Sequence, residues 1–217
     1  MKKLIGLLIF SLIILVSVQS QVNGAAGIRF GFPIGFHEIQ NDSKNWLSLN
    51  SMKEKTAYGF NISAYTFYSF TGFLSLQAEL SLTAGMGIKG EFDKDHYANA
   101  TYTCLDIPVL LKIHFVNNPG NQFGVMGGPL FTTALGKFRI RYTNYSNPDE
   151  EYDIKASHFG MTFGLFYSHF IEMANIVLDL RYIHDFKSSQ INISKSVSGD
   201  FIKRRGIIIS VGVEFAF

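Results

Sequence analysis

A few charged side chains stand within otherwise uncharged alternating segments, on the face opposite the apolar residues, and these charges are the best candidates for chemistry. Acids and bases gathered on one enclosed face can form ion pairs, hold water or pass protons, whereas an isolated buried charge is strongly unfavourable. We expect a salt-bridged plug; the alternative, a proton or ion path, would need a continuous file of water. The expected charge network consists of Arg29, Glu79, Asp106, Lys112, Asp179, Arg181 and Glu214.

Enzymatic and cofactor chemistry finds little support in the remaining motifs. The histidines are scattered, with no H-E-x-x-H spacing, and no serine stands in a G-x-S-x-G elbow. Residues 85–90 match G-x-G-x-x-G, but acidic residues follow instead of a helix that could hold a phosphate. We expect these glycines to let a strand bend into its loop. We therefore expect a protein that is not an enzyme and has no metal and no cofactor.

The elements that would position these charges are strands, as residues 74–86 indicate most clearly. Every even position there is apolar, and every odd position is polar or glycine. This period of two predicts a β-strand, and its length suits a tilted strand that crosses a bilayer. The apolar face would then contact lipid.

The same alternation recurs along the chain. It covers residues 27–36, 58–65, 105–115, 158–168, 176–183 and 206–217, and a glycine-rich, less regular stretch covers 122–137. Together with 74–86 these segments predict an all-β fold, an eight-stranded antiparallel up-and-down transmembrane β-barrel.

The connections between the predicted strands alternate between long and short. We expect long polar loops at residues 37–56, 87–100, 138–155 and 187–203, and short turns at 69–72, 116–121 and 169–174. Outer-membrane barrels show the same asymmetry, with brief periplasmic turns and longer external loops. Both ends of the mature chain would then be periplasmic.

The first residues predict export. Lys2 and Lys3 precede an apolar run from Leu4 to Val18, and small residues follow, as in a secretory signal peptide. We expect a signal peptide over residues 1–24, cleaved after position 20 or 24, and one barrel domain over 25–217. No later stretch is apolar enough for a membrane-spanning helix, although aromatic residues make up 15% of the chain. These features predict a location in the outer membrane of a Gram-negative bacterium.

Other bulk properties narrow the range of partners. The formal net charge of +2 gives no electrostatic signature of nucleic-acid binding. The single Cys104 cannot form an internal disulfide, and we expect a small packed side chain at a strand end.

Aromatic residues gather where this fold places the periplasmic headgroups. Rings that combine an apolar body with a polar tip favour that depth, so we expect an aromatic girdle there. The residues of this girdle are Phe67, Tyr68, Phe70, Phe73, Phe115, Phe123, Tyr167, Phe170, Phe215 and Phe217.

The final alternating run, with Val213, Phe215 and Phe217, resembles the C-terminal signal by which the barrel assembly machinery recognises its clients. Together with segments 105–113, 127–130 and 178–182, the mature chain resembles the PorT-like outer membrane beta-barrel family. More loosely, it is similar to the eight-stranded OmpA and OmpX barrels. Some members of the PorT-like family take part in protein secretion. The resemblance thus implies a barrel, with a possible partner in a secretion complex.

Three functions remain open. The first is a monomeric, non-enzymatic barrel in contact with outer-membrane lipids, whose external loops serve an envelope structural, adhesion or secretion-associated role. Within this hypothesis, Lys203, Arg204 and Arg205 are candidate contacts for lipopolysaccharide phosphates. The second is a narrow pore. The third is a soluble, lipocalin-like ligand-binding barrel, in which the apolar face would point inward.

Overall fold

The computed structural model describes residues 24–36, 38–39, 53–93, 96–118, 120–143, 150–155, 157–187, 189–194 and 197–216. Residues 1–23 of the expected signal peptide, with the cleavage position after residue 20, lie outside these residues, as does Phe217. Gly24, the other expected cleavage position, is the first residue of β1. Within them, no helix is long and apolar enough to cross a membrane.

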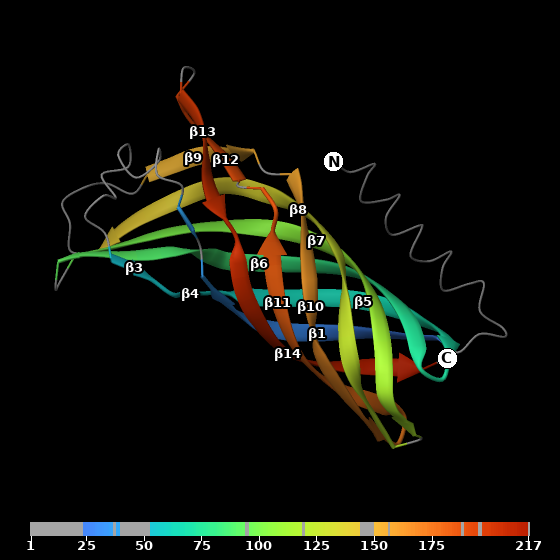
Figure 1. Ribbon diagram of the computed structural model, residues 1–217. Coiled ribbons are helices and arrows are strands. Elements are labelled where there is room, and N and C mark those ends of the chain that lie inside the picture. Colours follow the sequence, from blue (N-terminus) through green and yellow to red (C-terminus); the bar gives the residue numbers. More distant parts are fainter. Residues whose placement is uncertain are drawn as a thin grey trace.

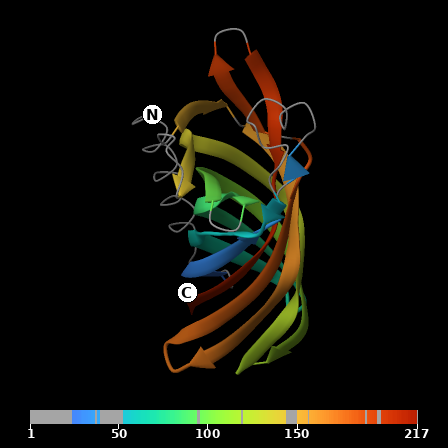
Figure 2. The same cartoon turned by 90° about the vertical axis from the view of Figure 1, so that its left-hand side faces the viewer.

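Eight long strands form a closed antiparallel barrel, in which each strand pairs with its neighbours along the chain and β1 closes the ring against β14 (Figures 1 and 2). The predicted fold class is confirmed. The barrel strands are β1 (Gly24–Gly35), β5 (Phe60–Thr71), β6 (Leu74–Asp93), β7 (His96–Asn118), β8 (Asn121–Thr143), β10 (Ser157–Ile171), β11 (Ala174–Asp185) and β14 (Arg205–Ala216).

One end of the barrel, here the turn end, carries tight connections. β5 and β6 are separated by Gly72 and Phe73 alone, and β10 and β11 by Glu172 and Met173. Ala25 pairs with Ala216, so both ends of the described chain also lie at this end. The predicted short turns are therefore confirmed.

At the other end, here the hairpin end, three of the predicted long loops contain strands instead, at residues 87–100, 138–155 and 187–203. Most of the fourth, 37–56, lies outside the described residues. The pairing of β6 with β7 continues through residues 87–101, where a loop was expected, and β8 runs on to Thr143. A bulge at Gly85, which has a φ of 76°, bends β6 without ending it. The remaining short strands at this end are β2 (Glu38–Ile39), β3 (Lys53–Lys55), β4 (Ala57–Tyr58), β9 (Glu150–Lys155), β12 (Ser189–Ser194) and β13 (Val197–Lys203).

Four of these short strands form what we call the hairpin-end sheet, with the order β9–β12–β13–β2. Each of them is adjacent in sequence to a barrel strand: β9 precedes β10, β12 follows β11, β13 precedes β14, and β2 follows β1. The hairpin-end sheet joins the described barrel strands through the pairing of β9 with β8. Figure 1 shows β9, β12 and β13 of this sheet together above the barrel.

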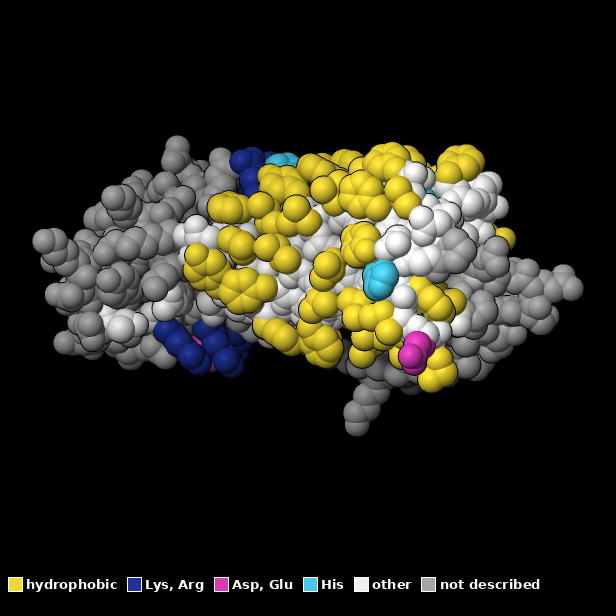
Figure 3. Space-filling model, turned by 90° about the horizontal axis from the view of Figure 1, so that it is seen from below, with side chains coloured by type: hydrophobic (Ala, Val, Ile, Leu, Met, Phe, Trp, Pro, Cys, Tyr) yellow, Lys and Arg dark blue, Asp and Glu magenta, His cyan; other side chains and the backbone are white. Residues whose placement is uncertain are grey.

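Apolar side chains cover the outside of the barrel, as the alternation predicts. Leu76 and Val211 are 40% and 49% exposed, whereas Glu79 and Glu214 are 6% and 1% exposed. Figure 3 shows the resulting hydrophobic area around the middle of the molecule, with Lys and Arg gathered toward one end. The lipocalin-like alternative is therefore wrong, because it needs the apolar face inside.

The aromatic girdle at the turn end needs one correction. Tyr68, Phe70 and Phe73 are exposed as expected, but Phe67 is buried, because its odd number places it on the inner face of β5. Phe67 packs there against Ala25 and Tyr65. Further rings on the outer face, not part of the predicted girdle, lie toward the hairpin end: the exposed pair Phe32–Tyr58, and exposed Phe159 against half-buried Phe131.

Candidate functional site

The middle of the lumen holds four charged side chains in one closed network, here the middle network. Arg29 on β1 contacts both Glu79 on β6 and Asp179 on β11. Arg181, also on β11, reaches the same two carboxylates at 2.7 Å and 2.8 Å. All four side chains are nearly inaccessible to solvent. Two cations thus share two anions, which is the arrangement that makes burial of charge tolerable.

Neighbouring groups complete the middle network. Gln77 donates a hydrogen bond to Glu79 at 3.1 Å, and the Arg29 guanidinium lies 4.1 Å from the centre of the Tyr65 ring. Arg29 Cγ also lies where a side chain at Gly212 would begin, 2.3 Å from the expected Cβ position. The absence of a side chain at this glycine leaves room for the arginine.

Two of the predicted network residues lie closer to the turn end and have other partners. Lys112 Nζ lies over the rings of Phe166 and Phe67, at 4.1 Å and 4.7 Å from their centres. Glu214 accepts hydrogen bonds from Tyr65 Oη at 3.1 Å and Asn175 Nδ2 at 2.9 Å. Their predicted inward positions are correct, but they do not take part in the ion pairs of the middle network.

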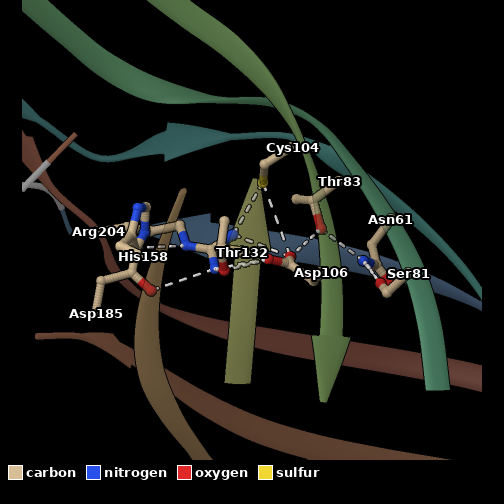
Figure 4. A network of polar contacts seen from close by, with 9 residues as sticks. All are labelled: Asn61, Ser81, Thr83, Cys104, Asp106, Thr132, His158, Asp185 and Arg204. Carbon is tan, nitrogen blue, oxygen red and sulfur yellow. Dashed lines mark hydrogen bonds and ion pairs between the residues drawn. The ribbon is translucent and has the colours of Figure 1, made fainter. Parts of the chain in front are cut away.

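A second network, here the hairpin-end cluster, surrounds Arg204 (Figure 4). The Arg204 guanidinium binds Asp106 on β7 in a fork, with two contacts of 2.9 Å and 2.8 Å. It also donates to both oxygens of Asp185, the last residue of β11, at 3.1 Å and 3.3 Å. Asp185 in turn contacts His158 Nε2 at 2.7 Å. Asp106 therefore belongs to a network separate from that of Arg29.

Polar side chains extend this cluster along the wall. Thr132 donates to Asp106 at 2.7 Å, and Thr83 donates to Asp106 at 3.1 Å. Asn61 then donates to Thr83 at 2.8 Å and to Ser81 at 2.6 Å. The chain of bonds thus runs from Arg204, just before β14, through β8, β7 and β6 to β5, around much of the inner wall (Figure 4).

Arg204 was predicted to face the membrane surface beside Lys203 and Arg205, and this prediction is wrong. Its side chain has no solvent exposure and points into the lumen, whereas Lys203 and Arg205 remain partly exposed. The reason is parity: even positions of β14 face inward, and residue 204 continues that series. The same correction applies to Cys104, which is fully buried within β7 instead of standing at a strand end, with its sulfur 2.9 Å from Arg204.

The two networks leave only a small space between them. A cavity of about 20 Å³ lies there, with Glu79 and Arg181 on one side and Asp106 on the other. This volume is about that required by one water molecule. At this level, the described side chains fill the lumen.

No catalytic arrangement is visible in the described residues. His158 and Asp185 lie at hydrogen-bond distance, but the second ring nitrogen of His158 has no partner among the described residues, so no hydroxyl is held there as a nucleophile. No group of three His, Cys, Asp or Glu side chains among the described residues could hold a metal ion.

A family model described as "Outer membrane protein beta-barrel domain" matches residues 19–190. The chain belongs to this family. The outer membrane is therefore its location, and the hairpin end faces the outside, because the short turns of such barrels are periplasmic.

Solved structures agree on the fold. OprG from Pseudomonas aeruginosa shares 12% identity with a TM-score of 0.55, covering 90% of this chain and 97% of its own. Neisserial surface protein A also shares 12% identity, with a TM-score of 0.52, covering 89% of this chain and 99% of its own. OmpT, an outer membrane protease from Escherichia coli, shares 12% identity at a TM-score of 0.46, covering 90% of this chain and 97% of its own. No curated protein matches the sequence of this chain.

Proposed function

We propose that this outer membrane barrel is a closed, non-enzymatic, monomeric scaffold that presents its hairpin end to the outside and does not conduct ions. The observation that carries the proposal is the filling of the lumen by two successive networks, the middle network and the hairpin-end cluster. A conducting path would need a continuous file of water through both. The cavity between them holds about 20 Å³, which suits a single water molecule.

Planar-bilayer recordings test this proposal. We expect the refolded protein to give no reproducible conductance steps. As a positive control, a variant with Arg29, Glu79, Asp179 and Arg181 replaced by Ala, together with Asp106→Ala and Arg204→Ala, should conduct, because both networks are removed without a change in net charge. Reproducible steps from the unaltered protein would favour the narrow pore instead.

The scaffold role that we propose is envelope structural, adhesive or secretion-associated, through the extended strands of the hairpin end. These strands are long enough to project beyond the membrane, since β7 and β8 each have 23 residues and a tilted strand needs only about 9–11 to span it. The resemblance to the PorT-like family favours a protein partner in a secretion complex. Photo-crosslinking from the outward Lys137 position in intact envelopes would identify such a partner; recovery of lipid alone would contradict the idea.

A second candidate contact is with phosphate groups of outer-leaflet lipopolysaccharide. Lys203 and Arg205 face outward, and Arg205 is the register partner of His184 on β11. His184 stands between Tyr182 and Phe186 in a row of rings, and Lys187 follows as an exposed cation. Aromatic side chains favour the headgroup depth, so cations beside them would meet lipid phosphates. Lys187 thus takes the place that the sequence analysis gave to Arg204.

The chain offers a matched control for this contact. Lys137 and Arg139 on β8 are also exposed cations, but both contact Glu151, at 3.2 Å and 3.0 Å. The hydrogen bond from Lys137, with the charge of Arg139, lowers the pKa of Glu151, as expected of an acid already occupied by cations. We expect Lys187→Ser with Lys203→Ser to weaken lipopolysaccharide binding, and Lys137→Ser with Arg139→Ser to leave it almost unchanged. If the two pairs of substitutions weakened binding equally, lipopolysaccharide would be attracted by positive charge in general and not bound at Lys187 and Lys203.

A further inference from the structure

The barrel and the hairpin-end sheet meet at a one-residue break between β13 and β14, and Arg204 is that residue. Backbone hydrogen bonds still cross this row, since the Arg204 and Arg205 carbonyls accept from Asp185 and Phe36. β13 ends at Lys203 and β14 begins at Arg205. In the neighbouring strand, β11 ends at Asp185, whose backbone N–H donates to the Arg204 carbonyl at 3.0 Å. The pairing of β1 with β14 also ends here, at Gly35 and Gly206. Beyond this row the chains pair again, as β2, β13 and β12.

The side chain of Arg204 crosses the lumen from this break. In the ring of eight strands β14 and β7 are four steps apart, so they stand on opposite walls. The Arg204 guanidinium nevertheless forms its fork with Asp106 of β7, and it donates to Thr132 of β8 at 2.8 Å. It also donates to Cys104 of β7, and its contacts on its own side are with Asp185. One side chain therefore joins both walls at the row where regular pairing stops.

We infer that Arg204 is a strut that fixes the position at which the β12–β13 hairpin leaves the barrel. Apart from the chain continuity of its four strands with barrel strands, the hairpin-end sheet is joined to the described barrel by the pairing of β9 with β8. A guanidinium suits the role because its planar fork holds a carboxylate in one orientation, whereas an ammonium acts as a point charge. The inference does not depend on whether the barrel conducts.

Hydrogen exchange of the full-length protein, folded in detergent or bilayers, tests the strut. In Arg204→Met we expect amide exchange over residues 189–203 to accelerate about tenfold or more, since buried charge-assisted bonds that oppose local opening are lost. Exchange over residues 107–114 and 176–183 should stay within a factor of about two. Arg204→Lys should give an intermediate acceleration, because it keeps the charge but not the fork.

Two further variants keep the test decisive. Arg204→Met leaves the Asp106 and Asp185 carboxylates buried without their cation, which is itself destabilising. The triple variant Arg204→Met, Asp106→Asn, Asp185→Asn removes these unpaired charges, and it replaces the single variant if that variant does not fold. The strut predicts acceleration over residues 189–203 in the triple variant as well; protection equal to that of the unaltered protein would overturn it. Arg181→Met, in the middle network, should leave residues 189–203 unchanged. An equal acceleration there would mean general loosening and would also overturn the strut.

Discussion

The two charged networks of the lumen differ in composition, position and attachment. The middle network balances two arginines against two carboxylates, all on the regular parts of β1, β6 and β11. The hairpin-end cluster has one arginine, two aspartates and a histidine, and its arginine stands at a break between strands. The difference indicates two tasks: the first network makes a charged lumen stable, and the second also connects the barrel to the sheet above it.

The comparison predicts the largest loss of barrel stability in the middle network. Arg29→Met leaves two carboxylates with a single arginine in a site without solvent. Removing one partner of a buried charge network costs about 3–5 kcal/mol, because the remaining charge stays buried. Urea unfolding in detergent micelles measures this loss. A decrease below about 1 kcal/mol would mean that Lys112 or solvent takes over the role of Arg29.

The next largest loss of stability is expected from overpacking of the barrel wall between the networks and the turn end. Two glycines on opposite faces of β8 allow this packing effect to be measured separately. Gly124 faces inward, and a Cβ there would lie 2.0 Å from the Ile113 carbonyl oxygen. Gly127 faces lipid, and its nearest neighbour would be Phe163 Cβ at 3.4 Å, an ordinary contact. We expect Gly124→Ala to cost about 1–3 kcal/mol by overpacking and Gly127→Ala to lie within about 0.5 kcal/mol of neutral, measured by the same unfolding titration. A reversed order would contradict the assignment of inner and outer faces.

The sequence predicts the middle network far better than the hairpin-end cluster, and the reason is the strand period. Arg29, Glu79, Asp179 and Arg181 stand inside clear alternating segments, so their inward direction follows from parity alone. What parity cannot provide is the register between strands, which decides that Arg29 meets Glu79 and Asp179 but not Asp106. That information depends on the closed barrel as a whole.

In the hairpin-end cluster the error came from ending strands too early. Even positions of β14 and odd positions of β11 face inward, so one further step along each strand gives Arg204 and Asp185. The predicted strands stopped at residue 183 and began at residue 206, so neither residue was assigned to a face. His158 stood on the correct face of its segment, but a single histidine beside glycines gives no sign of its partner. The sequence analysis also missed the long outer extensions of β6, β7 and β8. Strands outside the membrane need not alternate apolar and polar residues, so the period of two does not reveal them.

Cys104 offers a smaller test of the hairpin-end cluster. Its sulfur accepts from Arg204, but Arg204 keeps its fork with Asp106 and its contacts with Asp185. Cys104→Ala should therefore cost only about 1 kcal/mol, from one weak hydrogen bond and a small void. Thermal unfolding followed by the shift in gel mobility between folded and unfolded forms measures it. A loss as large as that of Arg29→Met would mean that Cys104 helps to hold the guanidinium in place.

The smallest loss of stability is expected for the ion pairs outside the lumen, which serve as the exposed reference for the buried networks. Lys137 and Glu151 are 3.2 Å apart, much as the buried pairs are, but their side chains are 52% and 43% exposed. Water screens the attraction and the free partner is readily solvated, so Lys137→Ser should change the free energy of unfolding by no more than about 0.5 kcal/mol. Added salt should reduce even that difference, whereas the loss in Arg29→Met should persist, because ions do not reach the lumen. If both losses fell equally with salt, the middle network would have to be open to solvent, and the closed-barrel proposal would fail with it.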